Sequence, residues 1–142
     1  MALVELLGAT VIGKDGDVDV ATISAENDVV GLYFSAHWCP PCRGFTPALG
    51  EYYTKLRAAG KNFQIVFISS DREDGAASEY YQTMPWLMLP FSDRAKKEAL
   101  GSKYEVTGIP TLVLLSAKSA DLITKEGRKV VSEDPDGKFC KP

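Results

Sequence analysis

The chain has 142 residues, of which 45% are hydrophobic and 25% are charged, a size and composition typical of one globular domain. Its 19 acidic and 16 basic residues give a formal charge of −3, and no long basic block is present to bind a phosphate backbone, so a nucleic-acid partner is not expected. No apolar run approaches the roughly 18 residues of a membrane-spanning helix, so membrane insertion is not expected either.

We predict a single domain over residues 1–142, with an N-terminal extension and hairpin over 1–27 and a polar tail over 133–142. The first seven residues lack the basic region, the longer apolar region and the cleavage site of a secretory signal. Three cysteines are too few, and an odd number, for the disulfide framework of a small secreted domain. These features favour a reducing cytoplasmic compartment, and a mature secreted protein that has lost its signal is the alternative. We expect a monomer, located in the cytoplasm and also in the nucleus.

The first half of the chain predicts a strand–helix–strand unit behind a hairpin. Residues 10–20 give two short strands around the turn at 13–16. The apolar, β-rich run at 29–35 is typical of a central strand covered on both faces. Apolar residues at three- and four-residue steps then predict a helix from Cys39 to a stop at Gly60. The strand at 63–69 is parallel to the first if this helix is a right-handed crossover.

The second half predicts helices at 73–82 and 94–104 and a strand hairpin formed by 111–115 and 122–125. Together these elements predict an α/β fold in which helices flank a central mixed β-sheet. The apolar run from Met84 to Leu89, which contains Trp86, is assigned to core packing. A partner surface near the active site is the alternative.

The sequence Trp38-Cys39-Pro40-Pro41-Cys42 stands where the central strand ends and the long helix begins. Two cysteines so spaced at a helix start can close and reopen a disulfide, as thiol–disulfide exchange requires. Because helix N–H groups and the macrodipole stabilise a thiolate, Cys39 is the predicted nucleophile and Cys42 the thiol that resolves the mixed disulfide. Pro40 and Pro41 fall in the first turn, where missing N–H groups cost little, and are expected to tune the redox poise.

The dipeptide Ile109-Pro110 heads a predicted strand. A cis bond there would leave the Ile109 backbone free to pair with an extended substrate. An ordinary trans proline at a strand start is the alternative, and the dipeptide alone favours it.

Several side chains near the motif allow two interpretations. Trp38 either covers the core or shields the thiol and touches substrate, with equal weight. His37, the only histidine, can modulate Cys39, but a solvated side chain is favoured. A zinc site can be drawn from His37, Cys39, Cys42 and Cys140, but structural zinc usually takes two spaced ligand pairs, so no metal is expected. Cys140 is predicted to be an exposed thiol able to form an intermolecular disulfide.

Several segments resemble the tryparedoxin and nucleoredoxin branch of the thioredoxin superfamily, and the resemblance runs over nearly the whole chain. They are residues 33–43, Asp71-Arg72, 84–87, 108–112 and the tail segment 134–139. The resemblance implies a thioredoxin fold, a Cys39 nucleophile, a Cys42 resolving thiol and a cis Pro110 facing them.

One position departs from the wider superfamily. Typical thioredoxins carry a buried aspartate six residues before the first cysteine, and Tyr33 occupies that place here. The proton acceptor for Cys42 is therefore open. We hypothesise that Asp71, at the carboxyl end of the neighbouring strand, partly supplies it. A turn or helix-capping aspartate is the alternative.

These observations predict a thiol–disulfide oxidoreductase that reduces protein disulfides without a bound cofactor. Its expected partners are disulfide-containing proteins and an external reductant, which is thioredoxin reductase with NADPH, glutathione or trypanothione. The alternative is a redox-responsive binding protein that regulates signalling partners through the Cys39/Cys42 redox state.

Overall fold

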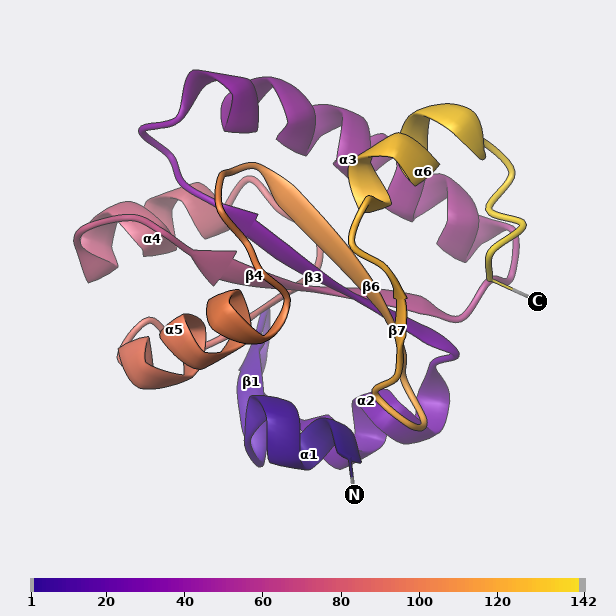
Figure 1. Cartoon of the computed structure of the whole chain (residues 1–142), viewed down its shortest axis with the longest axis horizontal. Coiled ribbons are helices and arrows are strands. Elements are labelled where there is room, and N and C mark those ends of the chain that lie inside the picture. The colour runs from indigo at the N-terminus through magenta and orange to yellow at the C-terminus, as the bar shows by residue number, and fades with distance from the viewer. Residues whose placement is uncertain (1, 141–142) are drawn as a thin grey trace.

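A mixed sheet of seven strands, in the order β2-β1-β5-β4-β3-β6-β7, forms the centre of the computed structural model, which describes residues 2–140 (Figure 1). The strands are β1 (Thr10–Gly13), β2 (Gly16–Asp19), β3 (Val29–Ser35), β4 (Phe63–Ser69), β5 (Leu87–Met88), β6 (Thr111–Ser116) and β7 (Leu122–Thr124). The helices are α1 (Ala2–Leu7), α2 (Val20–Glu26), α3 (Pro40–Ala58), α4 (Asp74–Tyr81), α5 (Arg94–Lys103) and α6 (Gly127–Glu133). The predicted mixed sheet flanked by helices, with its N-terminal hairpin of β1 and β2, is confirmed.

The central strand β3 is parallel to β4 on one side and antiparallel to β6 on the other. The β3–α3–β4 unit thus has the predicted parallel arrangement, and β6 and β7 form the predicted antiparallel pair. Because β3 and β4 run the same way, the loops that follow Ser35 and Ser69 lie at one edge of the sheet.

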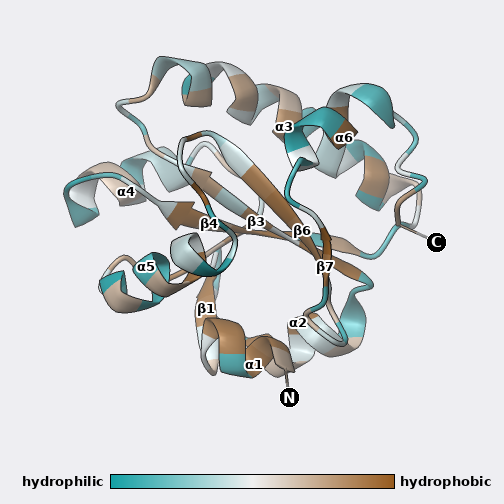
Figure 2. Ribbon diagram, viewed as in Figure 1, coloured by the Kyte–Doolittle hydropathy of each residue, from teal (hydrophilic) through white to brown (hydrophobic). Residues whose placement is uncertain are grey.

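Alternating side chains of the sheet supply two separate cores. Tyr33 packs with α3, α4 and residues of α6, whereas Leu32 and Phe34 pack with α1, α2 and α5 on the opposite face. Figure 2 shows the mostly hydrophobic strands at the centre, between helices of more mixed hydropathy, of which α1 is largely hydrophobic and α6 largely hydrophilic. Since side chains two residues apart share a face, Ser35 points to the same side as Tyr33, toward α3 and α4.

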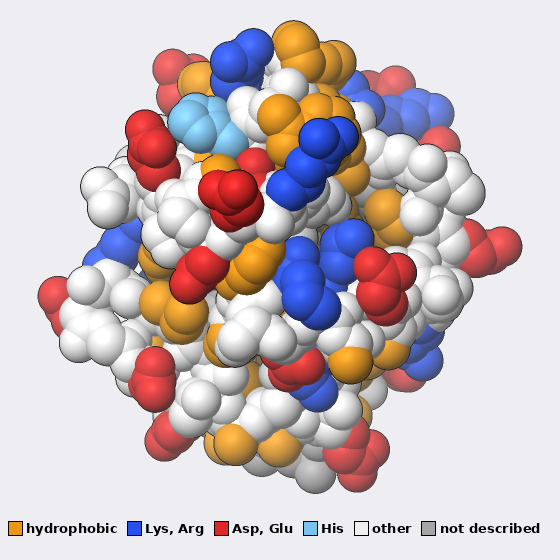
Figure 3. All heavy atoms as spheres, turned by 90° about the vertical axis from the view of Figure 1, so that its left-hand side faces the viewer, with side chains coloured by type: hydrophobic (Ala, Val, Ile, Leu, Met, Phe, Trp, Pro, Cys, Tyr) orange, Lys and Arg blue, Asp and Glu red, His pale blue; other side chains and the backbone are white. Residues whose placement is uncertain are grey.

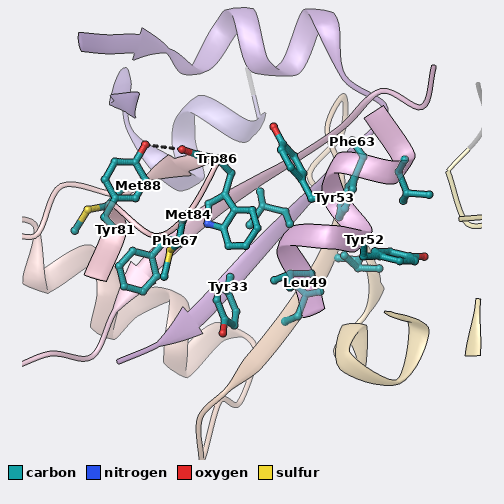
Figure 4. Packing of buried hydrophobic residues seen from close by; sticks show 14 of the residues in the cluster. Tyr33, Leu49, Tyr52, Tyr53, Phe63, Phe67, Tyr81, Met84, Trp86 and Met88 are labelled. Carbon is teal, nitrogen blue, oxygen red and sulfur yellow. Dashed lines mark hydrogen bonds between the residues drawn. The ribbon is translucent and has the colours of Figure 1, made fainter. Parts of the chain in front are cut away.

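Three short helices and one short strand are additions to the predicted elements. Helices α1, α2 and α6 have six or seven residues, too few to show a periodic apolar pattern. Strand β5 has two residues and places the run at 84–89 in the core, where Trp86 is 1% exposed. Figure 4 shows Trp86 above Tyr33 and beside Tyr53, so the core-packing interpretation of this run is confirmed.

The C-terminal tail is packed against the core rather than exposed. The ring of Phe139 meets Phe63 edge-on at 5.4 Å between centroids, and Cys140 is 1% exposed with its Sγ 3.7 Å from the carbonyl oxygen of Asn62. The expectation of an exposed Cys140 thiol is therefore wrong, because the tail folds back over α3 and the start of β4. An intermolecular disulfide through Cys140 would require this segment to open first.

Within residues 2–140, no helix combines the length and the apolar character needed to cross a bilayer.

Candidate active site

The two motif cysteines lie at the start of α3, directly after the loop that leaves β3. Cys39 is the N-cap residue, and Pro40 and Pro41 take the first helical positions, where no intrahelical N–H bond is lost. The backbone N–H of Cys42 donates to Cys39 Sγ over 3.4 Å. Cys39 is 5% exposed and Cys42 is fully buried, so Cys39 is the cysteine closer to solvent.

The segment that contains Pro110 faces this pair. The Ile109–Pro110 peptide bond is cis, and the carbonyl oxygen of Ile109 lies 3.9 Å from Cys39 Sγ. Ile109 also packs against the small cluster formed by Ala36, Cys39 and Cys42. The structure thus has the cis arrangement that the resemblance implied, and not the trans proline that the dipeptide alone favoured.

Trp38 lies on the surface beside the nucleophile. Its side chain is 56% exposed, and its indole N–H donates to the carbonyl oxygen of Ser70 over 3.1 Å. A hollow of about 500 Å³ on one side is lined in part by Arg43 and Arg72, and another of about 700 Å³ on the other side is lined in part by Ile109. Trp38 is therefore available to a bound substrate and does not cover the core.

Figure 3 faces the edge of the sheet that lies at the left in Figure 1, where the arrows of β3 and β4 end. Acidic, basic and apolar side chains are interspersed there around the single histidine. No charge of one sign dominates this face, so its electrostatics alone select neither an acidic nor a basic partner.

Asp71 connects the loops that follow β3 and β4. Its Oδ1 accepts the His37 backbone N–H at 2.8 Å, and its Oδ2 accepts the Ser69 hydroxyl at 2.8 Å. Within residues 2–140, no hydrogen bond joins Asp71 to Cys42. This geometry favours the turn-aspartate alternative over the proton-acceptor hypothesis.

The ring of His37 stacks on Tyr80, with centroids 5.0 Å apart and planes 3° apart. The side chain is therefore half-buried against α4 and is not the fully solvated histidine that the sequence favoured.

A cluster of buried hydroxyl groups lies against Cys42, on the α3 and α4 side of the sheet. Thr46 Oγ1 is 2.6 Å from the Tyr33 hydroxyl, 2.6 Å from the Tyr80 hydroxyl and 3.0 Å from the Cys42 carbonyl oxygen. Ser35 Oγ is 2.8 Å from the Tyr80 hydroxyl. Sequence reasoning missed this cluster, although Ser35 shares its face with Tyr33 and Thr46 follows Cys42 by one helical turn.

Burial is the main influence on the ionisation of Cys42. It raises the pKa of the Cys42 thiol above its ordinary value of 9.0, and the hydrogen bond with Cys39 acts in the same direction. A side-chain hydrogen bond from Ser35 and a backbone one from Ala36 lower the pKa of the same thiol. Burial likewise raises the pKa of Tyr33, so its hydroxyl stays protonated at neutral pH.

In the part of the chain that the structure describes, no three His, Cys, Asp or Glu side chains gather as a metal site would require. Cys140, one of the four residues of the zinc site drawn from the sequence, lies beside Asn62 just before the start of β4. Cys39, by contrast, follows the end of β3. Because β3 and β4 are parallel, these cysteines lie at opposite ends of the sheet.

Known proteins share both the sequence and the fold. Residues 27–121 match the family model described as thioredoxin-like. Tryparedoxin of Trypanosoma brucei brucei is 46% identical over 133 residues, which cover 93% of this chain and 90% of that protein. Human nucleoredoxin is 41% identical over 132 residues, which cover 93% of this chain but 30% of that protein. The chain therefore spans less than a third of the length of that nucleoredoxin.

Solved structures agree with this assignment. The structure of Trypanosoma brucei tryparedoxin superposes with a TM-score of 0.90 at 44% identity, over 97% of this chain and 95% of that one. Tryparedoxin II complexed with glutathionylspermidine superposes with a TM-score of 0.82 at 41% identity, over 92% and 88% of the two chains. On this sequence and structural similarity, together with the paired cysteines at the start of α3, the chain belongs to the thioredoxin-like oxidoreductases, in the branch that contains the tryparedoxins and nucleoredoxins.

Proposed function

We propose that this protein is a protein-disulfide reductase. The Cys39 thiolate attacks one sulfur of a target disulfide, forms a mixed disulfide and releases the other target sulfur as a thiolate. Cys42 then attacks Cys39, the bond to the target breaks, and the target leaves fully reduced. Two electrons pass to the target, and the enzyme is left with a Cys39–Cys42 disulfide.

The contact between the Cys42 N–H and Cys39 Sγ carries this proposal. It holds the nucleophilic sulfur at the helix start, where N–H groups favour a thiolate, with Cys42 one turn away. The carbonyl group of Ile109, which precedes cis Pro110, lies against the same sulfur and supports pairing with an extended substrate chain. The exposed Trp38, Pro40 and Pro41 border the site and are proposed to contact that chain.

The oxidised enzyme needs an external reductant to complete its cycle. The similar tryparedoxin II, whose structure is a complex with glutathionylspermidine, supports a small peptide thiol as this electron donor. In the hollow beside Trp38, Arg43 and Arg72 offer cationic groups to the carboxylates of such a peptide, and Asp71 and Glu73 in the same lining offer acceptors to its amino groups. Glutathione and trypanothione are therefore the first donors to test, with thioredoxin reductase and NADPH as the third. A donor system of this kind operates in reducing compartments, so we retain the cytoplasm and nucleus as the proposed location.

A second candidate function is redox-dependent binding of a protein partner. It is favoured by the 56% exposure of Trp38 between two hollows, which gives a partner an apolar anchor next to the cysteines. In this case closing the Cys39–Cys42 disulfide would change the affinity of that surface.

Insulin reduction in the presence of dithiothreitol separates the two functions. We expect turnover in the parent protein, none with Cys39→Ser, and a trapped mixed disulfide with Cys42→Ser. Cys140→Ser is the matched control, because this cysteine lies at the other end of the sheet, and it should keep the parent rate. Absence of turnover together with unchanged partner binding by Cys39→Ser would support the binding protein instead.

A further inference from the structure

The buried hydroxyl groups form a continuous chain beside Cys42, from Ser35 to the carbonyl oxygen of Cys42. The Ser35 hydroxyl is among the groups that lower the pKa of the Cys42 thiol. It lies 2.8 Å from the hydroxyl of Tyr80. The Tyr80 hydroxyl lies 2.6 Å from Thr46 Oγ1, which in turn lies 3.0 Å from the carbonyl oxygen of Cys42. Tyr33 joins as a branch, 2.6 Å from Thr46 Oγ1. All four hydroxyl-bearing residues are buried.

This chain can be polarised in two directions, because either partner can donate in each contact between two hydroxyl groups. When Cys42 is a thiol, its S–H donates to Ser35, Ser35 to Tyr80, Tyr80 to Thr46, and Thr46 to the Cys42 carbonyl oxygen. When Cys42 is a thiolate, Tyr33 donates to Thr46, Thr46 to Tyr80, Tyr80 to Ser35, and Ser35 to the sulfur. Every hydroxyl hydrogen has an acceptor in both states.

We propose that Ser35, Tyr80 and Thr46 are positioning residues that stabilise the Cys42 thiolate during the resolving step, by reversing the direction of their hydrogen-bond chain. This proposal rests on the proposed disulfide reductase. In the resolving step the Cys42–Cys39 bond forms as the Cys39–target bond breaks. The proton lost by Cys42 passes through solvent to the departing target thiolate. The chain itself loses and gains no proton, since only the hydrogens of its hydroxyl groups rotate.

Neutral groups are the ones available to stabilise the Cys42 thiolate. The titratable side chains around it are Cys39 on its own helix, Tyr33 on β3, Tyr80 on α4, His37 stacked on Tyr80, and Asp71 in the loop after β4. The two carboxylate oxygens of Asp71 accept hydrogen bonds from the His37 backbone N–H and the Ser69 hydroxyl. Within residues 2–140, no carboxylate is hydrogen-bonded to Cys42. A buried thiolate without a positive partner is costly, so hydrogen-bond donors aligned toward it are the available stabilisation.

The ring of Tyr80 is held by contacts other than its hydroxyl. It stacks on His37 at 5.0 Å and meets Phe67 edge-on at 5.4 Å between centroids. Tyr80→Phe therefore keeps the ring packing and removes only the hydroxyl at the centre of the chain. Thr46→Val and Thr46→Ser form a second pair, since valine removes the hydroxyl and serine keeps it.

The test is a stopped-flow reaction of the reduced protein with 5,5′-dithiobis(2-nitrobenzoic acid) over a pH series. Attack by Cys39 releases the first thionitrobenzoate, and resolution by Cys42 releases the second, so the two steps give separate absorbance phases. In Tyr80→Phe and Thr46→Val we expect the first phase to be unchanged. The pH midpoint of the second phase should rise by about one unit, which makes the rate of that phase about tenfold slower at neutral pH. Thr46→Ser should recover the parent profile.

Tyr53→Phe is the matched control, because the hydroxyl of this buried α3 tyrosine donates to Gln64 and lies outside the chain. It should leave both phases unchanged. If folded Tyr80→Phe and Thr46→Val proteins kept the parent pH midpoint in the second phase, the hydroxyl-chain proposal would be overturned. Failure of the proposed function gives a different result, in which the parent protein lacks a first phase at Cys39 or closes no Cys39–Cys42 disulfide.

Discussion

The phenolic oxygen of Tyr33 on β3 lies 2.6 Å from Oγ1 of Thr46, which follows Cys42 by one turn of α3. The same oxygen lies 3.5 Å from the carbonyl oxygen of Cys42. The ring is fixed by edge-on contacts with Phe45 and Trp86, each at 5.9 Å between centroids. A tyrosine thus joins the central strand to the active-site helix, at the position where typical thioredoxins carry a buried aspartate.

Tyr33→Phe should cost about 1 kcal/mol of unfolding free energy, the usual net value of one buried hydrogen bond. The loss is small because Thr46 keeps Tyr80 and the Cys42 carbonyl oxygen as partners. Urea unfolding of the reduced protein measures it, with Tyr53→Phe as a second buried tyrosine for comparison. A loss several times larger would show that the Tyr33 hydroxyl contributes more to stability than this one hydrogen bond.

Trp38→Ala should raise KM for insulin reduction while changing unfolding free energy by less than about 1 kcal/mol. The exposed ring contributes little to the core, and its indole N–H makes one solvent-accessible hydrogen bond with Ser70. Ile123→Ala is the control, because that side chain is 44% exposed on β7, away from the cysteines. Equal effects of both substitutions on KM would argue against a substrate contact at Trp38.

The strongly patterned parts of the sequence predicted their structure well. The apolar runs at 29–35 and 63–69 are the strands β3 and β4 with the predicted bounds, and the helix predicted from Cys39 is α3. These elements are long enough for their periodicity to be read, and they position the Cys39–Cys42 pair. Helices α1, α2 and α6 are one or two turns long, and their formation depends on packing against the sheet.

The polar interior of the site could not be predicted in the same way. Ser35, Thr46 and Tyr80 come from β3, α3 and α4, and only tertiary packing brings their hydroxyl groups together. Cys140 was misjudged for a similar reason, since a polar tail sequence does not reveal that Phe139 and Cys140 insert beside Phe63 and Asn62.

The reduced protein should lose stability as pH rises above about 8.5, the usual thiol pKa in an unfolded chain. Burial raises the pKa of both Cys42 and Cys140 in the folded state, so these thiols ionise first in the unfolded chain. The unfolded state then binds fewer protons, and unfolding free energy falls until the pH passes the folded pKa values. Urea midpoints measured with excess reductant from pH 7 to 10 test this. In Cys140→Ser the unfolding free energy should decline less steeply with pH. An unchanged slope would show that ionisation of Cys140 does not contribute to the decline.

Gly137→Ala should destabilise the protein by about 2 kcal/mol or more, through left-handed strain and overpacking. Gly137 has a φ of +67°, and a Cβ atom there would lie 2.5 Å from Leu56 Cδ2 on α3. Gly50→Ala is the control, because its Cβ would meet open space inside α3 and should stabilise the helix by about 0.5–1 kcal/mol. Thermal unfolding compares the two variants. A neutral Gly137→Ala would indicate that the tail is not packed on α3.

Asp71→Asn separates a structural role of this carboxylate from a role as proton acceptor for Cys42. The asparagine keeps one acceptor oxygen but replaces the other by a donor, so one of the bonds from His37 and Ser69 is weakened. We expect a loss of about 1–3 kcal/mol in unfolding free energy, as for bonds to a charged group. The second thionitrobenzoate phase should keep its rate, because Asp71 makes no hydrogen bond to Cys42 among residues 2–140. A second phase slowed tenfold in a folded Asp71→Asn protein, with Tyr80→Phe unaffected, would instead assign proton transfer to the carboxylate and leave the hydroxyl groups a purely structural role.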